Sequence, residues 1–193
     1  MPLEDGLVTI SRAATSITYP SRFTMLAAMN PCPCGYYTHP TKACSCSSQQ
    51  RDKYISKISG PLLDRIDIHV EVPVVLYSDL ASKQDAEPSS DIRIRVNTAR
   101  KAQNTRFKGT KIYFNAHMGP KHLKKFCGLD AESQELLKNA IENLGLSARA
   151  YDRILKVSRT IADLEGVDEI SSAHIAEAIQ YRSLDRDYWK VGI

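Results

Sequence analysis

Four of the five cysteines in this 193-residue chain lie within fifteen residues, as the pairs Cys32-Pro33-Cys34 and Cys44-Ser45-Cys46. Four thiolates suit a tetrahedral Zn²⁺ ion in a closed, structural site, because soft sulfur ligands favour zinc. Only one residue separates the cysteines of each pair, where two are common, so metal-free thiols, a disulfide or another metal remain alternatives. His39 could replace one cysteine, although an exposed loop histidine is more often solvated. We predict zinc bound by Cys32, Cys34, Cys44 and Cys46.

Asn30 follows a short, nearly continuous apolar run, residues 23–29. Such a run is typical of a strand buried on both faces, which would place Asn30 at the carboxyl end of that strand. A polar side chain at such a place is one kind of residue that phosphoryl transfer requires. The structural alternative is a turn, since Asn before Pro31 is a common turn opener.

Two arginines offer the permanent charge and planar set of donors that suit phosphate groups. For Arg65 the structural alternative is a local ion pair with Asp64 or Asp67. Arg149 follows Ser147, the predicted cap of a helix, by two residues. A cation in the first turn opposes the helix macrodipole, so a purely structural role is disfavoured there.

The beginning of the chain predicts a β-hairpin. Residues 8–10 and 17–19 are β-prone runs on either side of a polar tip, residues 11–16, which carries Arg12. Further on, a charged stretch at 48–58 predicts a short helix that Gly60-Pro61 stops. Residues 66–72 alternate apolar and polar side chains, and this alternation predicts another strand.

Beyond residue 90 the apolar pattern becomes helical and predicts a small bundle. Ser147 is a good N-cap for a helix ending near Glu165-Gly166, and Ser171 or Ser172 for the last helix, through Tyr181. Three apolar faces are formed by Ile92, Val96, Ala99 and Gln103; by Leu136, Leu137, Ala140, Ile141 and Leu144; and by Ile154, Leu155, Val157, Ile161 and Leu164.

Three other residues of the helical part are expected to have no chemical role. Arg153 and Arg159 are expected to cover solvent or an interface, as most helical arginines do. Cys127 stands apart from the other cysteines and is expected to be a small buried apolar residue.

The composition is that of a globular protein, with 42% hydrophobic residues and a net charge of +4. This small excess of positive charge is compatible with binding to a polyanion but does not demonstrate it. No run of eighteen apolar residues and no signal-peptide pattern occurs, so we expect a cytoplasmic protein that does not enter the membrane.

Three blocks of sequence resemble the ComM/YifB family of magnesium-chelatase-like AAA+ ATPases: VTISRA at 8–13, AAMNPCPCG at 27–35 and ISGPLLDRID at 58–67. A fourth, SARAYDRIL at 147–155 with RTIADL at 159–164, looks like the family's lid helix. The resemblance implies an α/β plus α fold. This would be the C-terminal half of an AAA+ αβα core, with β-hairpin, sensor strand, cysteine loop and arginine-finger strand, followed by an all-helical lid domain.

The implied domains are 1–76 for the core part with its cysteine-rich loop, 77–90 for a linker, 91–185 for the lid and 186–193 for a C-terminal tail. The linker is rich in Ser, Asp and Lys, which fits a connecting segment.

The resemblance also implies a role for each candidate residue. Asn30 would be the first sensor, Arg65 the arginine finger that reaches a neighbouring subunit, and Arg149 the second sensor in the lid. Arg12 would lie on a pore hairpin that follows the DNA backbone, unless it merely keeps a turn soluble. The expected assembly is a homo-hexamer that binds ATP and Mg²⁺ and acts on single-stranded or branched DNA, as in branch migration during transformation and recombination.

The sequence contains no Gly-x-x-x-x-Gly-Lys-Ser/Thr loop and no apolar strand ending in paired acids. We expect these elements upstream, with Met1 an internal residue or an artificial start, so that the chain alone does not hydrolyse ATP. Two other classes of function remain. One is a chelatase subunit that drives Mg²⁺ into a porphyrin, although the paired cysteines are not expected in that branch. The other is a non-enzymatic zinc module that binds nucleic acid or protein.

Overall fold

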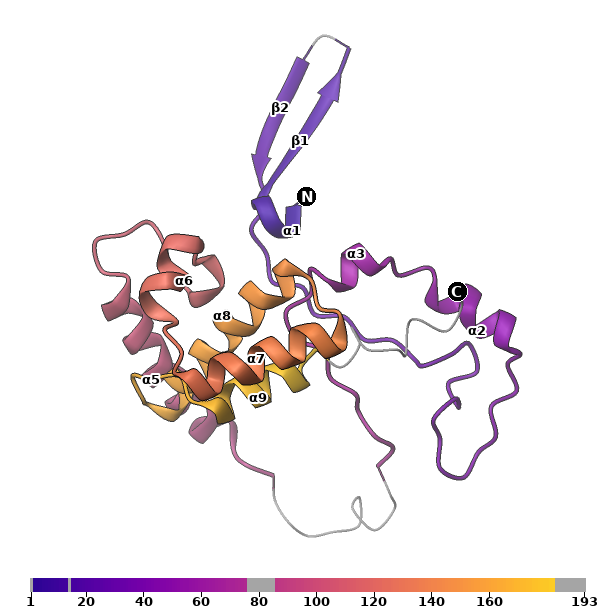
Figure 1. The fold of residues 1–193 in the computed structure, drawn as a ribbon. Helices are drawn as coiled ribbons and strands as arrows, with labels where there is room; N and C mark the ends of the chain where they lie inside the picture. Colours follow the sequence, from indigo (N-terminus) through magenta and orange to yellow (C-terminus); the bar gives the residue numbers. More distant parts are fainter. Residues whose placement is uncertain (1, 14, 76–85, 183–193) are drawn as a thin grey trace. The chain divides into compact units, whose positions relative to one another are not determined.

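The computed structural model describes residues 2–13, 15–75 and 86–182. The chain divides into two compact units, residues 1–65 and residues 66–193. In the described residues the fold is mixed α/β, made mostly of helices with one small two-stranded sheet (Figure 1). Much of the predicted linker, and all of the predicted tail at 186–193, fall outside the described residues.

The first unit contains the predicted hairpin. A short helix α1 (Pro2–Asp5) precedes strands β1 (Leu7–Arg12) and β2 (Thr15–Pro20), which pair antiparallel from Leu7 with Pro20 to Arg12 with Thr15. Hydroxyl groups pair across the strands, Thr9 with Thr18 at 2.9 Å and Ser11 with Ser16 at 3.0 Å. These cross-strand hydrogen bonds fix the register although both faces are largely exposed. Arg12 is the last residue of β1 and pairs with Thr15, so the turn is shorter than the predicted tip, residues 11–16.

The two other predicted strands are wrong. Residues 23–29 and 66–72 have no secondary structure, and Leu26 is 98% exposed. A strand needs a neighbouring strand for its backbone N–H and C=O groups, and no strand among the described residues pairs with either run. Within 66–72 one side chain that alternation had placed on the polar side, His69, is buried, and its backbone N–H donates to the Tyr181 carbonyl at 2.8 Å.

Helix α2 (Ser48–Ile55) confirms the predicted short helix and begins with a capping box, in which Ser47 and Gln50 exchange side-chain-to-backbone hydrogen bonds. It ends at Ile55, before the predicted stop. Gly60 and Pro61 instead begin helix α3 (Gly60–Leu63), because proline is well tolerated in the first turn, where its missing N–H has no partner to lose.

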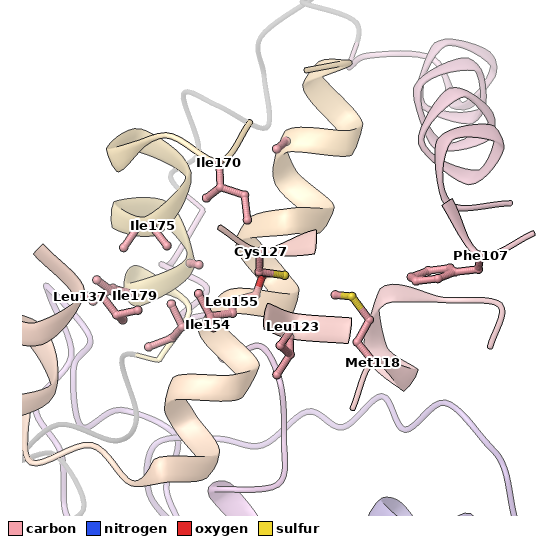
Figure 2. Packing of buried hydrophobic residues seen from close by; sticks show 12 residues of the cluster. Phe107, Met118, Leu123, Cys127, Leu137, Ile154, Leu155, Ile170, Ile175 and Ile179 are labelled. Atoms are coloured by element: carbon pink, nitrogen blue, oxygen red, sulfur yellow. The ribbon is translucent and has the colours of Figure 1, made fainter. Parts of the chain in front are cut away.

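The second unit is the predicted helical bundle. Its elements are α5 (Ser89–Arg106), the 3₁₀ turn η1 (Asn115–His117), α6 (Pro120–Phe126), α7 (Ala131–Leu144), α8 (Ala148–Glu165) and α9 (Ser172–Gln180). Helix α8 packs against α5, α6, α9 and η1, so it forms the centre of the bundle. The core gathers apolar side chains from α6, α7, α8 and α9 and from residues that directly follow α5 and η1; those labelled in Figure 2 are Phe107, Met118, Leu123, Cys127, Leu137, Ile154, Leu155, Ile170, Ile175 and Ile179.

The ends of the helices follow the predicted signals. The Ser147 hydroxyl accepts from the Ala150 N–H at 3.1 Å and begins α8. Gly166 ends it in the left-handed conformation with φ +83°, which glycine adopts without strain. Ser171 is the N-cap of α9, and its backbone N–H donates to His174 Nδ1 at 3.0 Å.

The predicted apolar face of α5 is only half correct. Ala99 and Gln103 are buried, whereas Ile92 and Val96 are exposed. The reason is that only the last turns of α5 lie close to the core, which includes Phe107, the residue directly after the helix. No helix among the described residues is long and apolar enough to span a bilayer.

Candidate metal centre and candidate nucleotide-contacting residues

The four clustered cysteines come together in space. All four Sγ atoms lie within 4.8 Å of one another, and Cys32 is fully buried. The Sγ atom of Cys32 is 3.4 Å from that of Cys34 and 3.7 Å from that of Cys44, and the Cys34 and Cys44 Sγ atoms are 3.6 Å apart. A tetrahedral zinc ion with Zn–S bonds of about 2.3 Å has S–S edges of about 3.8 Å. These side chains therefore fit a four-thiolate metal site.

The same distances exclude disulfide bonds, whose sulfur atoms are about 2.05 Å apart, and all five cysteines are free. His39 is not a member of the cysteine group, because its Nδ1 accepts hydrogen bonds from the backbone N–H groups of Thr41 and Lys42. The ring instead stabilises the turn between the two cysteine pairs.

Local structure holds each pair in place. After the first pair, Gly35 has φ +80° and its N–H donates to the Cys32 carbonyl at 3.0 Å, so the chain reverses there through a conformation that favours glycine. After the second pair, the N-cap of α2 follows at once. Arg51 on that helix donates from Nη1 to the Cys46 carbonyl at 2.8 Å. The loop is thus anchored to α2.

The thiols differ in acidity. Hydrogen bonding from the Tyr36 backbone N–H lowers the pKa of Cys34 to about 5, whereas burial raises the pKa of Cys46 to about 11. The surroundings therefore favour the thiolate form more at Cys34 than at Cys46. A bound cation favours the thiolate form at each ligand.

Arg65 lies in the first unit with its side chain held by two acceptors. Its Nε donates to Glu4 Oε2 at 2.9 Å and its Nη1 to the Pro61 carbonyl at 2.6 Å. Arg65 thus forms an ion pair with Glu4, sixty-one residues away, whereas Asp67 pairs with Arg153. The guanidinium is oriented by α1 and α3.

The other two predicted phosphate-contacting residues are exposed. Asn30 lies beside the cysteine loop, with its Nδ2 3.6 Å from the position that a Cβ atom on Gly35 would occupy. Arg149 lies in the first turn of α8, two residues after its cap. Asn30 and Arg65 therefore belong to one unit and Arg149 to the other.

A buried polar network in the helical unit was not predicted. The expectation that Arg159 covers solvent is wrong, since its side chain is 2% exposed and its Nε donates to Asp163 Oδ1 at 3.1 Å. Its two terminal nitrogens donate to the carbonyls of Val167 and Asp168. Arg153 forms the ion pair with Asp67, and its side chain is 15% exposed; its expected place at an interface stays a prediction. The available signal was the i, i+4 spacing of Arg159 and Asp163 on the apolar face of α8.

The described residues combine a mixed α/β fold with three features: an exposed hairpin, a compact four-cysteine loop and a helical bundle. These features together define the class of protein. Residues 86–182 match the family described as magnesium chelatase, subunit ChlI C-terminal, and residues 1–80 match magnesium chelatase, subunit ChlI. The chain belongs to this magnesium-chelatase family and is a ComM/YifB-like member of it, which confirms the resemblance seen in the sequence.

Curated relatives resemble nearly the whole chain. Competence protein ComM of Haemophilus influenzae is 44% identical over 96% of the chain, which corresponds to 35% of that protein. The uncharacterized protein YifB of Salmonella typhimurium is 40% identical over 96% of the chain and 36% of its own length. The uncharacterized protein Rv2897c of Mycobacterium tuberculosis is 35% identical over 94% of the chain and 35% of its own length. The chain thus spans about a third of the length of these relatives.

Proposed function

We propose that this chain is part of a hexameric AAA+ ATPase motor that remodels DNA, as in branch migration during recombination and natural transformation. The observation that supports it most is the 44% identity to competence protein ComM over 96% of the chain. The aligned stretch of 186 residues takes in nearly all of the chain. Fold membership alone would not suffice, because one fold hosts many functions.

In this proposal the nucleotide site forms between subunits. Arg65 reaches the γ-phosphate bound by a neighbouring subunit, where its permanent charge offsets the negative charge that develops during phosphoryl transfer. Asn30 orients the attacking water, and Arg149 reads phosphate from the lid and couples lid closure to hydrolysis. ATP and Mg²⁺ are held by a phosphate loop and an acidic pair in the remainder of the protein.

The hairpin is the proposed DNA contact of the motor. Arg12 ends β1 beside the tip, and its side chain is exposed. A basic residue at a pore can follow the phosphate backbone without reading bases, which a translocating motor requires.

Zinc is proposed as a structural ion on Cys32, Cys34, Cys44 and Cys46. With four protein ligands the site has no open position for a reacting water, so the ion would supply folding energy and hold the loop on α2. The buried Cys32 and the Arg51 contact to the Cys46 carbonyl support this role.

A chelatase subunit is the second candidate, because the matching families are described as magnesium chelatase. The deciding experiment uses the complete protein to which this chain belongs. DNA-stimulated ATP hydrolysis, together with migration of a branched DNA substrate, supports the motor. ATP-dependent insertion of Mg²⁺ into a porphyrin with partner subunits, and no response to DNA, would replace it with the chelatase.

A further inference from the structure

The first half of the helical unit carries a continuous excess of positive charge. Residues 92–129 contain four Arg and six Lys and no Asp or Glu. Because the whole chain has a net charge of +4, all other residues together have a net charge of −6. The mild overall charge therefore conceals one strongly basic region, which is the electrostatic pattern of a surface that binds a polyanion.

Three of the ten cationic side chains donate hydrogen bonds to other residues of the chain. Arg95 pairs with Glu87, Arg106 pairs with Asp163, and Arg100 donates to the Gln103 side chain and the Tyr113 carbonyl. The other seven are exposed, and they are Arg93, Lys101, Lys108, Lys111, Lys121, Lys124 and Lys125. We call these seven side chains, together with Tyr113 and Phe114, the basic surface.

Neighbouring elements carry this surface. The Phe107 ring at the end of α5 meets the Phe126 ring of α6 edge to face, with centroids 5.8 Å apart. Arg106 Nη1 donates to Asn115 Oδ1 at 3.0 Å, which ties the segment between the two helices to α5. In Figure 1 this segment joins α5 to α6. The lysines of α5, of the connection and of α6 therefore belong to one packed part of the unit.

Two aromatic rings lie among these cations. Tyr113 is 59% exposed and Phe114 is 44% exposed, although large aromatic side chains are usually well covered. The Arg100 guanidinium carbon lies 4.1 Å from the centre of the Phe114 ring, and Arg100 Nη1 donates to the Tyr113 carbonyl at 2.8 Å, so Arg100 holds both residues in place. Exposed rings beside backbone-binding cations are what single-stranded nucleic acids require, because unpaired bases stack on them.

We propose that the basic surface of the helical unit binds single-stranded nucleic acid, with its lysines on the phosphates and Tyr113 and Phe114 stacked on bases. The site is separate from the hairpin contact of the motor. This proposal rests on the proposed function only in taking nucleic acid as the partner. Binding at the basic surface requires neither ATP nor assembly of the hexamer.

The test measures binding of the whole 193-residue chain to a labelled oligothymidylate over a range of salt concentrations. We expect weak, salt-dependent binding, with a dissociation constant on the order of 10⁻⁴ to 10⁻⁶ M at physiological salt. Lys121→Gln/Lys124→Gln weakens binding at least about tenfold at low salt and reduces the salt slope by about 0.7 per lysine. The matched control, Lys53→Gln/Lys57→Gln, removes the same charge from exposed lysines of the first unit and leaves binding within about twofold of the original chain.

Tyr113→Ala separates nucleic acid from other polyanions. Loss of stacking weakens oligothymidylate binding at least about fivefold and leaves heparin binding unchanged. The proposal is overturned if the chain binds no oligonucleotide, if both lysine pairs lose affinity equally, or if Tyr113→Ala has no selective effect. None of these results bears on the ATP-driven motor, which is tested separately by DNA-stimulated hydrolysis in the complete protein.

Discussion

Arg106 and Asp163 form a two-pronged ion pair, in which Nη1 donates to Oδ2 at 2.7 Å and Nη2 to Oδ1 at 2.5 Å. The pair joins the end of α5 to the last turn of α8, fifty-seven residues further on. Asp163 also accepts from Arg159 and from the Asn115 amide, at 3.1 Å and 2.8 Å. One buried carboxylate thus balances two arginines and connects α5, η1 and α8.

Asp163→Asn should destabilise the helical unit strongly. The amide keeps the shape of the side chain but leaves Arg106 and Arg159 without a countercharge, and removing one partner of a buried ion pair costs about 3–5 kcal/mol. Urea unfolding followed by circular dichroism measures the loss. The control is Glu169→Gln, an exposed acid near the end of the same network, which should change stability by less than about 0.5 kcal/mol. If the two substitutions lowered the free energy of unfolding equally, the Asp163 carboxylate would not be the stabilising centre of the network.

The same carboxylate makes stability depend on acid pH. Burial alone would raise the pKa of Asp163, but hydrogen bonds and charge from Arg106, with help from Asn115 and Arg159, lower it below 3.8. A lowered pKa in the folded state means that the stabilisation is fully present above the unfolded pKa of about 3.9 and is lost as the pH falls through the folded value. The stability difference between the original chain and Asp163→Asn should therefore shrink between pH 5 and pH 3. A difference that stays constant over this range would show that Asp163 keeps its ordinary pKa.

Features governed by nearby residues could be predicted from the sequence. The hairpin, the cap at Ser147, the glycine stop at Gly166 and the cysteine group all depend on residues close together along the chain. The local pattern could not show whether residues 23–29 and 66–72 form strands, because a strand is stable only when it pairs with a neighbouring strand. Apolar runs alone do not reveal whether that neighbour is in the chain.

The roles of charged residues were harder to predict for a related reason. Helical periodicity places Arg159 and Asp163 on one face of α8, but the third member of the network comes from α5. Likewise, Arg65 pairs with Glu4, and the local sequence could not predict this partner because α1 and Arg65 meet only in the folded unit. The net charge of the whole chain hid the basic surface, because it sums a strongly positive region, residues 92–129, and a negative remainder.

Purified chain should contain about one zinc ion per molecule, measured by elemental analysis. Cys44→Ser removes one of the four thiolates and should reduce the zinc content sharply, since a serine hydroxyl is a poor ligand for zinc at neutral pH. Cys127→Ser is the matched control, because Cys127 is buried in the helical core and its thiol contacts the Leu155 carbonyl. A folded preparation without metal, or equal zinc loss in both variants, would refute the four-thiolate site.

Arg65→Ala in the complete protein should leave ATP binding intact and lower turnover by about a thousandfold or more, the range for arginine fingers. Arg153→Ala is the control, because Arg153 also pairs with a carboxylate and its side chain has the same exposed fraction, 15%.

An arginine finger acts on the neighbouring subunit, and this gives a sharper test. Arg65→Ala subunits mixed with subunits whose phosphate loop is inactivated should regain hydrolysis, because some interfaces then combine an intact loop with an intact Arg65. Each variant alone should be inactive. If mixing restores nothing although the rings assemble, Arg65 acts within its own subunit, and its pairing with Glu4 is its function.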